Sequence, residues 1–193
     1  MDAVMTAPAV ETIAGRLHNQ TLTPESFEAL PSNSYRYEYI GGKAVVMSPA
    51  GGRHGRIATR LIGFFSVQIP QGYHLYDSST GYRLPNGDVR SPDLSIIAPG
   101  RLPGELDPIG FLEIPPDLAI EIISPSERYE DVIIKVREYL GWGVKAVWVV
   151  EPATSEVVVH STEDITRLIG EDELCGGDAA PGFAHQVNDL FPG

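Results

Sequence analysis

The sequence predicts an α/β (α+β) fold in which helices flank a central mixed β-sheet. Two observations predict it: short apolar strands that pair across tight turns, and two long amphipathic helices between the groups of strands. The 193 residues suit one domain with a substantial core. Residues 1–20 lack clear periodicity, so we expect a mobile N-terminal arm there and a single domain over 21–193.

The first half of the chain predicts a short helix, a hairpin, a long helix and several strands. In "LTPESFEALP", Thr23 suits the N-cap and Pro24 the first helical position. The two alternating runs of "YRYEYIGGKAVVMSP" around a Gly-Gly pair are typical of a hairpin. "RHGRIATRLIGFFSVQIP" has apolar residues at helical spacing, and "YHLYDSSTGYRLPNGDVRSPDLSIIAP" predicts strands with a turn at its Asn-Gly pair.

The second half predicts a strand, a helix and a second hairpin. A Pro/Gly-rich loop spans about 99–116, and "DLAIEII" follows it as a buried strand. Ser124 and Glu127 suit a capping box for the amphipathic helix that comes next. "KAVWVVEP" and "EVVVHS" form the hairpin, and the tail "EDELCGGDAAPGFAHQVNDLFPG" is loop-rich with a short closing element at "HQVNDLF".

Charge and cysteine content restrict the class of protein. The chain has 14 Lys and Arg against 26 Asp and Glu, a net charge of −12. This balance does not favour nucleic acid or an anionic membrane, although a local basic groove or bound cations can offset it. The single Cys175 excludes an intrachain disulfide and gives no zinc cluster. With no signal-peptide pattern and no apolar run long enough to cross a bilayer, we expect a soluble cytoplasmic protein.

A carboxylate stands where a buried strand should be apolar. Glu121 lies in the middle of "LAIEII", and an ionised carboxylate without a partner costs several kcal/mol to bury. Asp93 lies at the mouth of another apolar strand, in "SPDLSII". If the two strands are neighbours, the carboxylates converge, and Mg²⁺ prefers such oxygen ligands. Lys135, at the edge of the apolar stripe of the following helix, can point its ammonium group towards them.

These segments resemble a known bacterial family. "SPDLSII" and "LAIEIISPSERYEDVIIKVREYLGWGVKAVWVVEP", with "YEYIGGKAVVMSP", "RHGRI" and "YRLPNGDVRSPD", are similar to the putative restriction endonucleases long catalogued as a domain of unknown function. That family belongs to the PD-(D/E)xK nuclease superfamily. The resemblance covers roughly residues 22–160. It implies a restriction-endonuclease-like core, Mg²⁺- or Mn²⁺-dependent hydrolysis of DNA phosphodiester bonds, and a homodimer.

The resemblance also assigns roles to particular residues. Asp93 matches the aspartate of the "PD" element and Glu121 the acid of the (D/E)xK element, so both are expected metal ligands. The sequence departs at Ile123, where the superfamily has lysine, and Lys135 of the next helix matches the displaced lysine. Glu38 and His54 match a recurrent acid and histidine of the family and are expected accessory residues.

Structural interpretations stand beside these assignments. Asp93 suits the cap of a turn, and Glu121 with Lys135 forms a buried ion pair that requires no catalysis. Glu38 suits an exposed strand position, and His54 the first turn of a helix. Arg53, Arg56 and Arg60 form a basic patch that helix-surface solvation explains as well as contact with DNA phosphates does. Asp88 and Asp117 suit turns, and Trp142 and Trp148 suit core packing.

Two alternative functions therefore stay open. One is a non-catalytic binding module on a degenerate nuclease fold, which the missing lysine at Ile123 and the net charge of −12 favour. The other is a hydrolase of a smaller phosphodiester, which suits the acidic charge.

Overall fold

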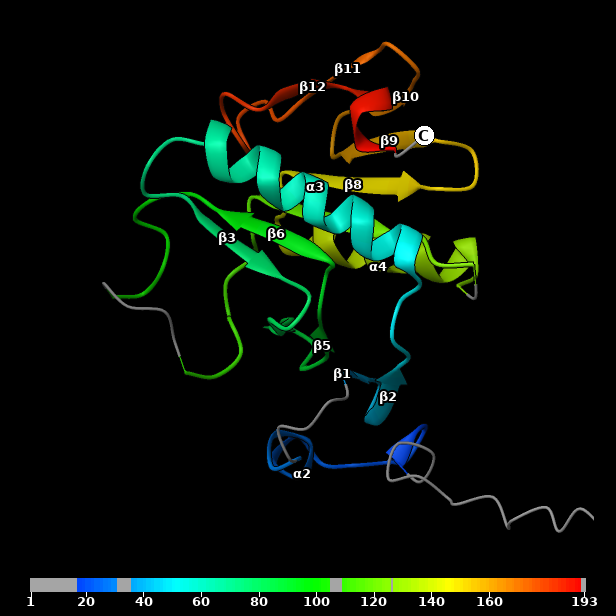
Figure 1. Cartoon of the computed structure of the whole chain (residues 1–193). Coiled ribbons are helices and arrows are strands. Elements are labelled where there is room, and N and C mark those ends of the chain that lie inside the picture. Colours follow the sequence, from blue (N-terminus) through cyan, green and yellow to red (C-terminus); the bar gives the residue numbers. More distant parts are fainter. Residues whose placement is uncertain (1–16, 31–35, 105–108, 126, 192–193) are drawn as a thin grey trace, which may run out of the picture.

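The computed structural model describes residues 17–30, 36–104, 109–125 and 127–191. Its main feature is a six-stranded mixed sheet in the order β10-β9-β8-β7-β6-β3 (Figure 1). β7 and β8 pair in parallel, and the other neighbours pair antiparallel. The strands are β3 (His74–Asp77), β6 (Leu94–Ile97), β7 (Leu118–Ile122), β8 (Ala146–Glu151), β9 (Glu156–Ser161) and β10 (Ile165–Ile169).

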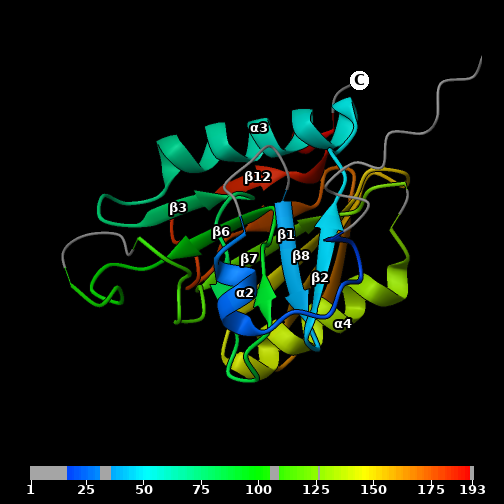
Figure 2. The same ribbon diagram turned by 90° about the horizontal axis from the view of Figure 1, so that it is seen from below.

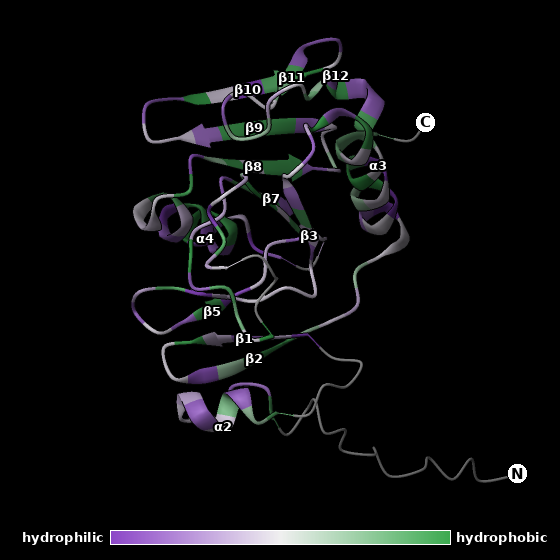
Figure 3. Ribbon diagram, turned by 90° about the vertical axis from the view of Figure 1, so that its left-hand side faces the viewer, coloured by the Kyte–Doolittle hydropathy of each residue, from purple (hydrophilic) through white to green (hydrophobic). Residues whose placement is uncertain are grey.

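Two helices cover the opposite faces of this sheet. α3 (Gly52–Gln68) crosses one face and α4 (Tyr129–Trp142) lies on the other, and Figure 3 shows the two helices on either side of the strands. α4 connects β7 to β8, because a parallel pair needs a crossover rather than a tight turn. The prediction of a mixed sheet flanked by helices is confirmed.

The two faces of β7 belong to different layers. Leu118, Ile120 and Ile122 pack in the cluster that contains the buried side of α3. Ala119 and Ile123 pack in the cluster that contains the buried side of α4. Because successive side chains of a strand point to opposite faces, Glu121 points towards α4.

A smaller four-stranded sheet lies beside the main one, in the order β2-β1-β5-β4 (Figure 2). Its strands are β1 (Arg36–Ile40), β2 (Lys43–Met47), β4 (Tyr82–Arg83) and β5 (Val89–Arg90). β1 and β2 form the predicted hairpin, and both residues of its turn, Gly41 and Gly42, have the positive φ that favours glycine. The short helix α2 (Pro24–Glu28) packs here through Phe27, and Thr23 caps it as predicted.

The sequence interpretation missed one strand of the main sheet and misplaced the start of one helix. The strand β10 was not foreseen, because its alternation is weak and its side chains are mostly exposed. Ser124 does not begin α4, which starts at Tyr129 with Arg128 as its N-cap. The Ser124 backbone N–H still donates to the Glu127 carboxylate, but this bond closes a turn before the helix.

The C-terminal segment closes over the α3 face of the main sheet. It contains the two-stranded sheet of β11 (Glu173–Cys175) and β12 (Ala184–Gln186), followed by the 3₁₀ helix η1 (Val187–Leu190). Phe183, Val187 and Leu190 join the cluster around α3. The closing element predicted at "HQVNDLF" is thus present, as part of β12 and η1.

The proposed N-terminal arm lies mostly outside the described residues. Residues 19 and 20 do exchange backbone hydrogen bonds with Ala44 of β2. The single domain over 21–193 stays a prediction. Within the described part of the chain, no helix is both long enough and apolar enough to cross a membrane.

Candidate active site

Glu121 is buried on the α4 side of β7 with two partners from one helix. Its Oε2 accepts from Lys135 Nζ at 2.9 Å, and its Oε1 accepts from the Tyr139 hydroxyl at 2.9 Å. Lys135 and Tyr139 are four residues apart, so both lie on the buried side of α4. These two donors are the compensation that a carboxylate inside the core requires.

Lys135 is shared among three carboxylates. Besides Glu121, its Nζ lies 3.6 Å from Glu127 Oε1 and 3.9 Å from Glu38 Oε1. Burial lowers the pKa of Lys135, but these acids raise it by more, and the net change is upward. Lys135 therefore stays charged although it is buried.

The pKa of Glu121 shows how tightly the acids are gathered. Burial raises this pKa to about 7; the Lys135 charge lowers it, and the charges of Asp93 and Glu38 raise it. Three carboxylates therefore influence one another at this end of the sheet. A cation placed among them would reduce their mutual repulsion.

Asp93 lies beside Glu121 across two antiparallel strands. β6 and β7 pair Leu94 with Ile120, so one more residue along this register sets Asp93 opposite Glu121. Asp93 Oδ2 accepts from the Ile122 backbone N–H at 2.8 Å and contacts His54 Nε2 at 3.0 Å. Burial raises the pKa of Asp93, but His54 and these hydrogen bonds lower it by more, so the carboxylate is ionised.

His54 sits in the first turn of α3, as predicted, and also contacts Asp93. Burial lowers the pKa of His54, whereas the hydrogen bond to Asp93, the Asp93 charge and Glu127 raise it, and the net change is upward. His54 thus links the start of α3 to the acids at the end of β6 and β7.

Glu38 is buried, so its interpretation as a surface strand residue is wrong. Its Oε2 accepts from Arg90 at 3.0 Å, and its Oε1 accepts from the Ser91 backbone N–H at 3.2 Å. Arg90 also binds Glu138 of α4 through two nitrogens, at 2.8 and 3.0 Å. Glu38 and Arg90 thereby join the small sheet to α4 beside Lys135.

The structure brings all five predicted residues together, in two linked groups. One is Asp93 with His54, and the other is Glu121 with Lys135 and Glu38. Sequence reasoning missed Arg90, and it counted Tyr139 only as part of an apolar stripe. The sequence does contain a signal for the role of Tyr139, because this residue is one helical turn after Lys135 and bears a hydroxyl that can reach the same carboxylate.

Asp93 and Glu121 are the residues that could hold a metal ion. Their carboxylates are hard oxygen donors on neighbouring strands, and every oxygen bound by one donor keeps a second lone pair. Among the residues that the structure describes, Asp93 Oδ1 has one charged neighbour, the Arg36 guanidinium, at 3.5 Å. No group of three or more His, Cys, Asp or Glu able to hold a metal occurs among the described residues. Two carboxylates match the small protein donor set with which Mg²⁺ is often bound, the rest of its shell being water and phosphate.

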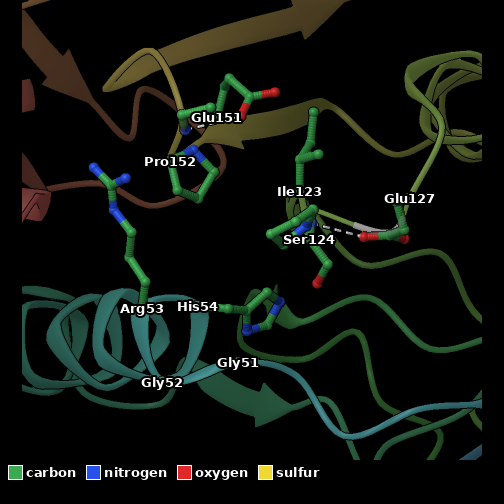
Figure 4. Close-up of a pocket in the computed structure, with 11 residues that line it drawn as sticks. Gly51, Gly52, Arg53, His54, Ile123, Ser124, Glu127, Glu151 and Pro152 are labelled. Carbon is green, nitrogen blue, oxygen red and sulfur yellow. Dashed lines mark hydrogen bonds between the residues drawn. The ribbon is translucent and has the colours of Figure 1, made fainter.

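A pocket of about 450 Å³ opens next to these residues (Figure 4). It lies where the parallel strands β7 and β8 end, facing the start of α3. His54 and Glu127 connect it to Asp93 and Lys135 respectively. The lining residues are Gly51, Gly52, Arg53, His54, Ile123, Ser124, Pro125, Glu127, Glu151, Pro152 and Ala153.

The other acids, tryptophans and arginines named from the sequence are not among the five predicted site residues, and most of them have contacts that serve the fold. Asp88 belongs to a turn, where it accepts from Asn86 and from the Gly41 backbone N–H. Asp117 is more than a turn residue, because it is fully buried and paired with Arg101 and Lys145. Trp148 lies in the core and Trp142 packs against the buried Tyr82 cluster. Arg53 and Arg56 are exposed and Arg60 half-buried on α3.

Comparison with known proteins assigns the chain to a family. The Uma2 family model, described as "Putative restriction endonuclease", matches residues 24–187. The chain belongs to this family. The match contains all five predicted site residues, and it confirms the restriction-endonuclease-like resemblance predicted from the sequence.

A solved structure supports the fold of this Uma2 protein. The chain is similar to the crystal structure of a putative nuclease belonging to DUF820 from Anabaena variabilis, with a TM-score of 0.79 and 22% identity. The alignment covers 88% of this chain and 97% of that chain. At this identity the likeness shows the fold alone. Among curated proteins none matches this sequence.

Proposed function

We propose that this Uma2 protein is a metal-dependent endonuclease that hydrolyses DNA phosphodiester bonds. One observation carries the proposal: two buried carboxylates, Asp93 and Glu121, come from neighbouring strands and lie next to a pocket that His54 lines, and Lys135 binds one of them. Membership of a family described as "Putative restriction endonuclease" supports the same reaction class.

Each residue has a distinct role in this proposal. Asp93 and Glu121 would hold Mg²⁺ or Mn²⁺, which when bound supplies water activation and charge stabilisation at phosphorus. Lys135 fixes the orientation of Glu121 and contributes a permanent positive charge for the phosphoryl oxygens. His54 fixes Asp93 from the pocket side, and Glu38, held by Arg90, fixes the position of Lys135.

A specific observation favours a second candidate, a non-catalytic binding module. Both oxygens of Glu121 already accept hydrogen bonds, and Lys135 is neutralised by three acids. A purely structural network would have the same geometry, because a buried ion pair is stable only when it is fully satisfied. Ile123 at the usual lysine position agrees with this alternative.

A cleavage assay separates the candidates. Linear duplex, single-stranded DNA and a dinucleotide phosphodiester are incubated with the wild-type protein in Mg²⁺ or in Mn²⁺. The metallonuclease predicts cleavage of DNA that chelator abolishes and that Asp93→Asn and Glu121→Gln each reduce by at least about a hundredfold. The matched control Glu163→Gln, on an exposed carboxylate, should cleave like wild type.

The other outcomes point to the alternatives. Absence of cleavage by a folded protein with both metals would favour the binding module. Cleavage of the dinucleotide but not of DNA would favour the smaller phosphodiester. Cutting both strands of a duplex needs two active sites, and a homodimer would supply them; sedimentation of the intact protein measures that state.

A further inference from the structure

Cations without an acidic partner are unevenly distributed over the described residues. Within 17–30, 36–104, 109–125 and 127–191, most Lys and Arg side chains form ion pairs with carboxylates. Those that do not are Lys43, Arg53, Arg56, Arg60 and Arg137. Three of these five lie inside α3, in the stretch 53–60, although the net charge of the protein is −12.

The three arginines of α3 form one stripe, which we call the α3 stripe. Arg53, Arg56 and Arg60 are spaced three and four residues apart, so they follow one side of the helix. Arg53 lines the pocket, and the stripe leads away from it along α3. Arg60 donates to the Asp189 backbone carbonyl, which leaves its charge unpaired.

Arg53 does not serve the stability of α3. The first turn of this helix has no acidic residue, and its N-cap Gly51 makes no side-chain hydrogen bond. A positive side chain in the first turn opposes the helix dipole, typically by about 0.3–1 kcal/mol, and Arg53 lies in that turn. An unpaired arginine at this position is more readily explained by an anionic partner than by folding.

The opposite wall of the pocket has the opposite charge. Glu127 comes from the turn after β7 and Glu151 is the last residue of β8, across the pocket from Arg53 and His54 of α3 (Figure 4). A DNA duplex carries phosphates on two backbones, about one charge per 1.7 Å of its axis. A second backbone near this wall would be repelled, whereas the uncharged bases of a single strand would not be.

We propose that the pocket and the α3 stripe bind single-stranded DNA, with one phosphate backbone along the three arginines. This inference rests on the proposed function, since it names the substrate class of the same site. It requires one protomer for each cut, because a single strand has one backbone to hydrolyse.

Binding without catalysis tests the inference. Fluorescence anisotropy is measured with two labelled probes, a single strand of roughly 15 nucleotides and a hairpin whose duplex stem has roughly 15 base pairs. A chelator is present to prevent cleavage, and the salt concentration is varied. We expect the single strand to bind at least about tenfold more tightly, with log K falling against log salt with a slope of about −2 for three contacts.

Variants locate the contacts. Arg53→Gln and Arg56→Gln should each weaken single-strand binding and reduce the steepness of the salt dependence by about 0.7. Arg137→Gln is the matched control, because Arg137 is an exposed, unpaired arginine on α4, across the sheet from α3. It should bind like wild type.

Three results would overturn the inference: equal or tighter binding of the duplex, no binding of either probe, or α3 variants that behave like Arg137→Gln. Its failure differs from failure of the proposed function. Metal-dependent duplex cleavage that the α3 variants retain would sustain the nuclease and reject this surface. Single-strand binding with the expected salt slopes, in a protein that never cleaves, would sustain this surface and reject the nuclease.

Discussion

The two faces of β7 are built from different chemistry. The face towards α3 is apolar, with Leu118, Ile120 and Ile122 packed against residues such as Leu61. The face towards α4 carries Glu121 between Ala119 and Ile123, and two polar groups of α4 meet it. Both faces are buried, yet only the second contains charges that need partners. One strand thus supplies the core on one side and the candidate site on the other.

Removing the central cation should have the largest effect on the α4 face. Lys135→Ala leaves Glu121 buried without its counter-charge, and we expect a loss of about 3–5 kcal/mol in the free energy of unfolding. The double variant Glu121→Gln with Lys135→Met should recover most of this loss. Urea unfolding measures both, and equal losses in the single and double variants would contradict a paired role.

The loss in Lys135→Ala should also depend on pH. Burial raises the pKa of Glu121 to about 7 in wild type, and this variant lacks the cation that lowers it, so its Glu121 pKa is higher still. A carboxyl whose pKa is raised on folding disfavours the folded state progressively as pH rises from its unfolded pKa to its folded pKa. Wild type and variant share this effect up to about pH 7, so the difference between them should increase from neutral to alkaline pH. A loss that stays constant across this range would argue against a buried, ionisable Glu121.

The α3 face should respond to volume and not to pH. Leu61 is fully buried, so Leu61→Ala creates a cavity and should cost about 3 kcal/mol. Unfolding in urea at several pH values should give the same difference from wild type each time. A cost that changed with pH would mean that the two faces are less independent than the packing indicates.

A smaller change isolates one hydrogen bond of the site. Tyr139→Phe removes the donor to Glu121 Oε1 and keeps the buried ring. We expect a loss of about 2 kcal/mol, as for a hydrogen bond to a charged group. Leu140→Met, one residue along the same helix and without a polar partner, serves as the control and should cost less. Equal losses in the two variants would show that the hydroxyl contributes little.

The smallest effect is expected from His160 on β9. Burial lowers the pKa of His160, and its buried Nε2 has no hydrogen-bond partner in the described structure. A histidine with a lowered pKa in the folded state takes up its proton more readily when unfolded, so stability falls as pH drops below the ordinary pKa of 6.5. His160→Leu should remove this part of the pH dependence between mildly acid and neutral pH. An unchanged pH profile would contradict it.

The sequence predicted the parts that depend on local pattern. Helix and strand periodicity located α3, α4 and the main hairpins, and the resemblance located all five candidate residues. β10 could not be predicted because its exposed side chains carry no clear alternation. The burial of Glu38 and Asp117 also escaped prediction, since it depends on Arg90, Arg101 and Lys145, which only the tertiary fold brings close.

The central claim is that Asp93 and Glu121 bind one divalent metal ion together. Calorimetric titration of Mn²⁺ tests it most directly, above the pKa of Glu121, on wild type, Asp93→Asn, Glu121→Gln and the control Glu163→Gln, each shown to be folded. We predict one site in wild type and control and its loss in both site variants. No binding by the folded wild type, or unchanged binding by either site variant, would contradict the claim and leave Glu121 and Lys135 as a structural ion pair.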